Sequence, residues 1–472
     1  MGNACNRTSS GACSEAEGFQ THASGGASHA EGANTLAEGT ASHAEGLQTS
    51  ARGGSSHTEG SNTVAEGSAS HAEGYFTRAS ANTSHSEGSG SLASGYASHA
   101  EGSSTRALNF YAHAEGNLTT ASGLAAHAEG ENTIASGLVS HAEGQGTRAQ
   151  GESSHAEGDT TQANGRASHA EGNLTVAFGS FAHAEGQSSL AGELAHAEGN
   201  GTQALGQSSH AEGAFTIASG ITSHAEGVNT VASGIFSHTE GESTNANNIV
   251  GVHVMGRFGS ANELPYSWYL ANGMDASTPG LAAKILSNGN VKIDGTVTTP
   301  AADYAEMFET TDGNPIEFGY FVTLEEDKVR IANGQDDYIL GITSAKPAFL
   351  ADSGELRWKH KYMTTEWGEI LYEDIFVPPI MDNSGNEIVP QRVERRPVLN
   401  PAWDATRDYL PRGNRPEWVA IGLLGKLLVR DNGLCKSNRF CKPNDKGIAI
   451  PSDTGYRVLR RTAPNQILIL FR

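Results

Sequence analysis

Small and polar residues alternate along residues 14–245 with a period of 14. Each period has two seven-residue halves, which read Ser-His-Ala-Glu-Gly-x-x and Thr-x-Ala-Ser-Gly-x-x. Positions 1 and 3 of each half are small, and positions 2 and 4 carry His and Glu, or a variable residue and Ser. This alternation predicts β-strands, because successive strand side chains point to opposite faces. A helix is disfavoured, since a glycine costs about 1 kcal/mol relative to alanine within it.

The motif His-[Ala/Ser/Thr]-Glu-Gly occurs 16 times, and every step is 14 residues except the 13 from His183 to His196. Two short strands per period predict a parallel β-solenoid with Ser, Thr and Ala in its narrow interior. We expect the glycines to take a positive φ at the corners. About 17 coils, at roughly 4.8 Å for each rung, predict a rod of about 80 Å.

The constant His and Glu side chains lie on one outward face of the predicted coil, and the variable residues lie on the other. A thin coil buries little surface alone, so a homo-oligomer is expected to cover one face. The constant face is the candidate for the shared axis. The alternative is a solvated His/Glu ladder without a structural role.

The repeat resembles the head domain of trimeric autotransporter adhesins over about residues 14–245. Repeats of that family read Ser-Val-Ala-Ile-Gly and build a left-handed parallel β-roll trimer, so the resemblance implies a mainly β homotrimer. It also places His and Glu where the family faces the trimer. The expected interface ladder includes His29, Glu31, His43, Glu45, His127, Glu129, His224 and Glu226.

Pairing within this ladder is expected to raise the histidine pKa values and to lower those of the glutamates. It therefore predicts the greatest trimer stability at mildly acidic pH. No metal and no cofactor are expected, because each His has a Glu beside it and not a second His. A metal- or ligand-binding solenoid stays an alternative.

The net charge of −22 is concentrated in the repeats. Residues 1–245 hold 25 Asp and Glu against 6 Arg and no Lys, whereas residues 246–472 hold 28 against 25 Lys and Arg. An acidic chain is a poor partner for nucleic acid. No apolar stretch is long enough to span a membrane, and no secretory signal follows Met1. The pairs Cys5/Cys13 and Cys435/Cys441 are candidates for local disulfides or free thiols.

The rest of the chain is expected to be mainly β. Residues 246–302 predict a small connector that caps the solenoid, with strands at 249–255, 267–270, 283–286 and 290–293. Residues 303–472 predict a domain with hairpin arms at 322–324 and 329–331, a long apolar strand or strand pair at 418–429, and a closing strand at 466–471.

Asp303 and Glu306 are the candidate catalytic residues. In a helical turn, two residues three apart share a face, and two close carboxyl groups can hold their pKa values apart for general acid–base chemistry. The Asp-x-x-Glu pattern is a weak signal by itself.

Residues 301–308, 319–324, 337–341, 415–426 and 452–456 together resemble the C-terminal intramolecular chaperone of phage tail spikes and preneck appendages. That family is classed among self-cleaving glutamic peptidases, and the resemblance covers about residues 300–472. It implies that the domain assists trimer assembly and then cuts the Ala302–Asp303 bond in a single turnover. Glu306 is the implied general base, and Asp303 is the acid or orienting group.

The sequence therefore predicts a homotrimeric phage fibre or spike, in a virion or as a prophage product, whose partner is a host-surface receptor or glycan. The alternative is an uncleaved adhesin or spore-coat fibre on a bacterial or spore surface. In that alternative the C-terminal domain is a permanent trimer clamp.

Overall fold

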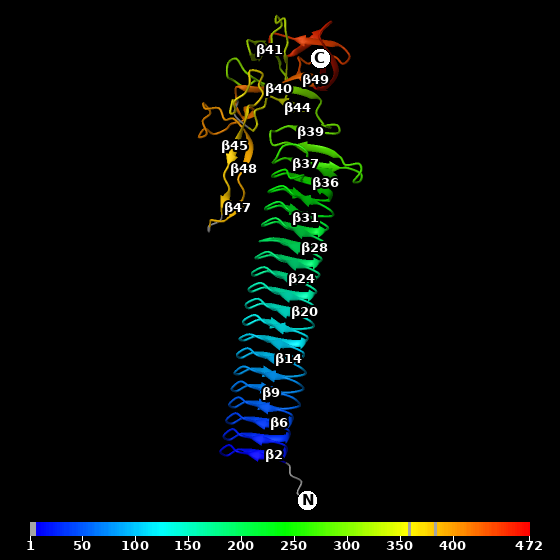
Figure 1. Cartoon of the computed structure of the whole chain (residues 1–472). Coiled ribbons are helices and arrows are strands. Elements are labelled where there is room, and N and C mark those ends of the chain that lie inside the picture. Colours follow the sequence, from blue (N-terminus) through cyan, green and yellow to red (C-terminus); the bar gives the residue numbers. More distant parts are fainter. Residues whose placement is uncertain (1–5, 357–359, 382–384) are drawn as a thin grey trace. The chain divides into compact units, whose positions relative to one another are not determined.

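A computed structural model describes residues 6–356, 360–381 and 385–472 (Figure 1). The chain divides into two compact units, Met1–Gly295 and Thr296–Arg472. Within the described residues the only helix is a 3-10 turn, η1 (Arg412–Asn414), and all other regular structure is β. No helix in this described part is long and apolar enough to cross a membrane.

The first unit is a parallel β-solenoid, as predicted (Figure 1). Each rung has one strand that begins at the motif His and a second short strand that ends on Ala. Examples are β4 (His29–Ala33), β5 (Leu36–Ala37), β6 (His43–Leu47) and β7 (Ser50–Ala51). Strands of successive rungs pair in parallel, with His29 opposite His43 and Leu36 opposite Ser50.

The same register continues to β34 (His238–Thr239). The 13-residue step does not break it, because β26 (His183–Gln187) and β28 (His196–Asn200) still pair His183 with His196. The missing residue is absorbed in the corner after β27 (Leu190–Ala191).

Small side chains fill the solenoid interior. The alanines of both half-repeats are fully buried, as at Ala30 and Ala37, and the preceding Ser28 and Thr35 are buried with them. This confirms the predicted inward positions. The interior is too narrow for larger groups, so the shaft owes its regularity to Ser, Thr and Ala on every rung.

Most rungs carry two glycines, and the two have different structural roles. Gly46, in the His-Ala-Glu-Gly half, has the predicted positive φ, +105°, although it lies within β6 and not at a corner. Gly53, in the other half, does not take a positive φ, so the prediction is wrong for this position. A Cβ on Gly53 would lie 1.8 Å from the carbonyl oxygen of Gly67 on the next rung. At Gly53 itself the close stacking leaves no room for a side chain, although Ala81 and Asn109 occupy the equivalent position on other rungs.

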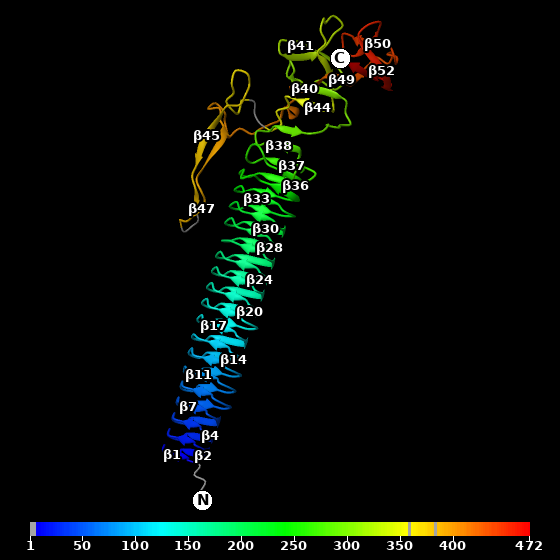
Figure 2. The ribbon, with the colours of Figure 1, turned by 45° about the vertical axis from the view of Figure 1, so that its right-hand side comes forward.

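The solenoid continues into a cap. β36 (His253–Ser260) adds another parallel rung by pairing His253 with His238, and β37 (Trp268–Asn272) pairs in parallel with β36. β38 (Leu281–Ile285) and β39 (Val291–Ile293) then add antiparallel strands (Figure 2). Larger residues, including Val254, Tyr269 and Leu286, form the core of this cap.

The strands of the second unit are β40 (Asp303–Glu309), β41 (Phe321–Glu325), β42 (Lys328–Ile331), β43 (Gly341–Thr343), β44 (Phe349–Ala351), β45 (Tyr372–Val377), β46 (Ile380–Met381), β47 (Glu387–Val389), β48 (Arg392–Pro397), β49 (Trp418–Arg430), β50 (Phe440–Pro443), β51 (Ala449–Ser452), β52 (Tyr456–Ala463) and β53 (Gln466–Phe471). The main sheet has the strand order β42-β41-β43-β49-β53-β52-β50-β51. β40 pairs in parallel with β44 and antiparallel with β49. Two further ladders, β45–β48 and β46–β47, form a separate arm (Figure 2).

The predicted hairpin, long strand and closing strand are all present in this sheet. β41 and β42 form the hairpin, and β49 is one continuous 13-residue strand. β53 pairs with β49 along Gly425–Arg430. Apolar residues of these strands, including Phe321, Ile342 and Ile469, are buried together, and this core fixes the sheet against which β40 lies.

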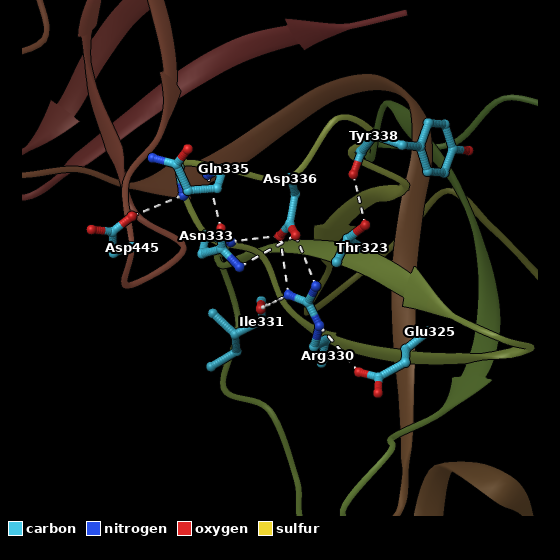
Figure 3. A network of polar contacts seen from close by, with 10 residues as sticks. Thr323, Glu325, Arg330, Ile331, Asn333, Gln335, Asp336, Tyr338 and Asp445 are labelled. Atoms are coloured by element: carbon cyan, nitrogen blue, oxygen red, sulfur yellow. Dashed lines mark hydrogen bonds and ion pairs between the residues drawn. The ribbon is translucent and has the colours of Figure 1, made fainter.

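A polar network holds the loop that follows the hairpin (Figure 3). The Arg330 guanidinium donates two hydrogen bonds to Asp336, at 3.0 and 2.8 Å, and one to Glu325 at 3.2 Å. The backbone N–H of Asn333 also donates to Asp336, at 2.7 Å. The bond from Arg330, together with that from Asn333, holds the Asp336 pKa below its usual value.

Candidate functional site

The Ala302–Asp303 bond lies where exposed chain enters the sheet. Residues 287–298 are exposed, and so is Ala302, whereas Asp303 is only 7% exposed at the start of β40. The Ala302 carbonyl accepts a hydrogen bond from the Lys426 backbone N–H at 3.3 Å, and the Asp303 carbonyl accepts one from Ala348 at 2.8 Å. Backbone N–H groups thus hold the carbonyls of both residues, while Asp303 is buried and Ala302 is open to solvent.

Asp303 and Glu306 lie on a β-strand, so the expectation of a helical turn is wrong. Residues three apart on a strand point to opposite faces. Asp303 accepts a hydrogen bond from the Ser344 hydroxyl at 2.6 Å, in a buried position. Glu306 instead accepts a hydrogen bond from the Tyr304 hydroxyl at 2.5 Å, on the exposed face. Within one chain the two carboxyl groups therefore have different partners and do not form a pair.

Sequence reasoning missed three residues that shape this site. Ser344 follows β43 and holds the Asp303 carboxyl group. Gly425 has a φ of +119°, and a Cβ on it would lie 2.1 Å from the Ala302 carbonyl oxygen. Lys426 contributes its backbone N–H. The glycine within a long apolar strand was a visible signal for Gly425, whereas no local signal connects Ser344 with a residue 41 positions earlier.

The His/Glu ladder is the second notable site. The imidazoles of successive rungs stack with ring centroids 4.4–4.9 Å apart, from His29 to His253. Their side chains are about one-third exposed, as at His43 (35%). His43 lies 3.5 Å from Glu31, His127 lies 3.9 Å from Glu129, and His224 lies 3.6 Å from Glu212. His and Glu thus share one outward face and interleave across rungs; Glu45 contacts His57 and Glu226 contacts His238 in the same way.

The predicted rise in histidine pKa is wrong. Burial, followed by the neighbouring imidazoles, lowers the pKa of eight ladder histidines, including His85 and His127. A histidine with a folded pKa below 6.5 contributes stability that is lost as the pH falls. These histidines therefore provide no gain at mildly acidic pH.

The glutamates follow the prediction only on some rungs. Neighbouring carboxyl groups hydrogen-bond to each other, which raises the pKa of Glu115 and Glu143 to about 7 and lowers that of Glu129 between them. Stacking at the rung spacing brings like groups together, and this effect was not visible from a single repeat.

The structure has Cys435 and Cys441 as buried free thiols and Cys13 as an exposed one. Burial raises the pKa of Cys435 to about 11 and that of Cys441 to about 12. Of the two alternatives left open by the sequence, the pair Cys435/Cys441 therefore takes the thiol form. Cys5 lies outside the described residues.

Comparison with known families matches both units. Residues 269–466 match the family described as Peptidase_G2, IMC autoproteolytic cleavage domain. Residues 114–138, 170–191 and 197–223 match the YadA head domain repeat. The chain thus combines head-type β-solenoid repeats with a C-terminal domain similar to an autoproteolytic family.

Particular relatives are phage proteins. The Pre-neck appendage protein of Bacillus phage B103 is 35% identical over 179 residues, which are 38% of this chain and 19% of that protein. The Pre-neck appendage protein of Bacillus phage phi29 is 35% identical over 145 residues, which are 30% and 16%. The chain therefore matches less than a fifth of the length of these curated relatives. The crystal structure of the phi29 gene product 12 C-terminal fragment is 30% identical, covering 36% of this chain and 100% of the fragment, with a TM-score of 0.29.

Proposed function

We propose that this chain is a phage fibre or spike subunit that assembles as a homotrimer and then cleaves its own Ala302–Asp303 bond. The observation that carries the proposal is the position of this bond at the entrance to β40. The exposed Ala302 leaves one side of the peptide open to water, and the buried Asp303 holds the other side. The similarity to an autoproteolytic cleavage domain supports the same conclusion.

The carbonyl of the proposed scissile bond already has a hydrogen-bond donor. The Lys426 backbone N–H points at the Ala302 oxygen from 3.3 Å. This oxygen gains negative charge when a nucleophile adds to its carbon, and a fixed donor stabilises that charge. Gly425 permits the approach, because any side chain there would meet the same oxygen.

In the proposed reaction, a water oxygen bonds to the Ala302 carbonyl carbon while Glu306 takes the proton of the water. The C–N bond then breaks, and the Asp303 nitrogen leaves with a proton as a new amino terminus. Asp303, oriented by Ser344, donates or guides this proton. The reaction is of the glutamic type, needs no cofactor and occurs once for each chain.

We further infer that Glu306 acts on the bond of a neighbouring copy. At about 3.3 Å per residue along a strand, the Cα atoms of Asp303 and Glu306 are about 10 Å apart. A general base must come within about 3 Å of the water proton or reach it through one water. A carboxylate that lies on the other face and is bound to Tyr304 does not reach its own Ala302 carbonyl. Glu306 of the partner subunit would complete the site, so cleavage would depend on assembly.

Denaturing gel electrophoresis of freshly produced full chain tests the cleavage. We expect fragments of 302 and 170 residues from the wild type and a single intact band from Glu306→Gln. Glu309→Gln is a matched control, because Glu309 lies on the same strand and is bound to Lys328. An intact wild-type trimer would contradict the proposal and favour an uncleaved surface fibre with a permanent clamp.

A further inference from the structure

At several ladder histidines, carboxylate oxygens from two rungs lie within 4.0 Å of the imidazole Nε2 atom; these are His127, His141, His169 and His196. The Nε2 atom of His127 lies 3.8 Å from Glu115 on the preceding rung and 3.9 Å from Glu129 on its own rung. The Nε2 atom of His169 lies 3.3 Å from Glu157 and 3.7 Å from Glu171. Glutamate and histidine therefore alternate along the shaft as a continuous row of nitrogen and oxygen ligand atoms.

Most of these nitrogens are covered but have no hydrogen-bond partner. The Nε2 atoms of His113, His127, His141 and His155 are buried and make no hydrogen bond, and their nearest carboxylate oxygens lie 3.6–4.0 Å away. Each side chain as a whole is about one-third exposed. Native proteins rarely leave a buried polar atom unpaired, and each exception requires an explanation. Here the unpaired nitrogens are repeated on successive rungs, which indicates a common ligand.

The distances fit a small divalent ion. Zinc binds imidazole nitrogen and carboxylate oxygen at about 2.0–2.2 Å, so two ligands of a tetrahedral zinc lie about 3.4 Å apart. The observed nitrogen–oxygen separations of 3.3–4.0 Å need inward movements of only a few tenths of an ångström. The centroids of successive imidazole rings are 4.7–4.9 Å apart. The Nε2 atoms of two stacked rings are therefore too far apart to bind the same ion.

We propose that the His/Glu ladder is a linear array of zinc-class divalent metal sites. Each ion binds three ligand atoms: one imidazole Nε2, one carboxylate oxygen of the same rung and one carboxylate oxygen of the preceding rung. Each glutamate bridges two ions. Imidazole with carboxylate is a ligand set that suits zinc and the neighbouring transition metals. The expectation of no metal was based on a single repeat, which shows only one histidine and one glutamate. In the fold, a neighbouring rung supplies the second glutamate.

The array is repeated and accessible. Groups of histidine and glutamate side chains whose ligand atoms lie within 4.8 Å of one another run without a break from His99 to His169, and each group holds at least one imidazole beside a carboxylate. Ten more groups of metal-ligating side chains occur in the described residues. A groove of about 510 Å³, lined by glutamates and glycines from Glu101 to Gly158, runs beside this stretch. All ligands come from one chain, so the array depends on neither the proposed trimer nor the cleavage.

Zinc binding to the full chain tests the array. Protein treated with a chelator, dialysed against micromolar zinc and analysed for metal is expected to retain several ions per chain. The triple variant Glu115→Gln, Glu129→Gln, Glu143→Gln removes both carboxylates from His127 and His141 and is expected to lose at least two ions. The control Glu131→Gln, Glu152→Gln, Glu193→Gln makes the same change in charge outside the ladder and is expected to lose none.

Two results would overturn the proposal. One is a wild-type chain that retains no zinc. The other is a ladder variant that retains as much zinc as the control, which would indicate adsorption to imidazoles alone. If the ladder variant does not fold, cobalt replaces zinc in the wild type. Visible absorption bands of low-symmetry cobalt with nitrogen and oxygen ligands are then expected, and a spectrum of aqueous cobalt would contradict the array.

Discussion

Gly425 shows how a single residue positions the proposed scissile bond. It lies opposite Asp303 in the β40–β49 ladder, with a φ of +119° that side chains rarely adopt. The missing side chain also lets β49 approach the Ala302 carbonyl oxygen and present the Lys426 N–H to it. One glycine therefore serves both the backbone conformation and the close approach of the two strands.

The substitution Gly425→Ala is expected to displace the Ala302 carbonyl and to slow cleavage at least several-fold. Strain and overpacking together should destabilise the domain by about 1–3 kcal/mol. A time course on denaturing gels measures the cleavage, and urea denaturation of the uncleavable Glu306→Gln background measures the stability.

The control variant Gly313→Ala separates the effect of backbone strain from the effect of overpacking. Gly313 also has a positive φ, +72°, but nothing lies within 4 Å of a Cβ placed there. We expect this control to cleave at the wild-type rate. Equal rates for Gly425→Ala and the wild type would show that the close approach is unimportant.

At the scale of the elements, the stacked rungs of the solenoid leave little room for additional side-chain atoms. Each rung pairs in register with the next, and the interior holds only small side chains. At most glycines of the second half-repeat, an added Cβ would meet backbone atoms of the next rung and not a movable side chain. Ala81 and Asn109 occupy this position on other rungs. The stability of each rung depends on its nearest neighbours, as expected for a solenoid.

The adjacent residues Gly53 and Gly54 provide a test of how closely the rungs are stacked. Gly53→Ala places a Cβ 1.8 Å from the Gly67 carbonyl oxygen, whereas a Cβ on Gly54 meets only the Thr40 oxygen at 3.8 Å. We expect Gly53→Ala to destabilise the shaft by about 1–3 kcal/mol and Gly54→Ala to have little effect. Thermal unfolding followed by circular dichroism distinguishes them, and similar melting curves would contradict the stacking argument.

The loop beside the β41–β42 hairpin is expected to respond to acid. Arg330 and the Asn333 N–H depress the Asp336 pKa below 3.8, so this contribution to stability is present above pH 3.8 and is lost as the pH falls through the folded value. Glu325 is the other charged group that contacts Arg330. Asp336→Asn should lower the urea midpoint at neutral pH and have little effect near about pH 2. A constant difference across this range would contradict the assignment.

At the scale of the whole molecule, the charge is carried by the repeated part of the chain. The repeats account for most of the net charge of −22, and much of it lies in the glutamates of one row. Like carboxyl groups at the rung spacing share hydrogen bonds. The acidic composition is therefore concentrated on one face of the shaft, where a homotrimer or bound cations would compensate it.

Co-assembly tests the proposed exchange of catalytic groups between copies. A tagged Glu306→Gln chain expressed alone is expected to stay intact. Co-expressed with the wild type, part of the tagged chain should be cut, because Glu306 of the partner subunit is supplied within the mixed trimer. Western blotting of the tag measures the cut fraction. If the tagged chain stays intact in purified mixed trimers, Glu306 acts within its own chain after a rearrangement.

Much of the fold was predictable because its causes are local. The strict period of 14 determines two strands for each rung and places Ser, Thr and Ala inside. Turn residues and apolar runs located the hairpin of β41 and β42 and the closing strand β53. The start of β36 was less accurate, since the strand begins at His253 and not at residue 249. The strand carrying Asp303 and Glu306 was mistaken for a helical turn, because its extended conformation comes from pairing with β44 and β49.

The sequence by itself determined the repeat architecture, the division of charge along the chain and the identity of the candidate carboxyl groups. These features follow from composition and from short-range alternation, which any stretch of the chain displays. Only the tertiary structure decided that Asp303 and Glu306 face opposite ways and that Ser344 and Gly425 border the candidate bond. It also decided that ladder histidines such as His127 and His169 lie between two carboxylates. The physical reason is that strand pairing and rung stacking bring together groups 12 to 122 positions apart, and no local pattern specifies such contacts.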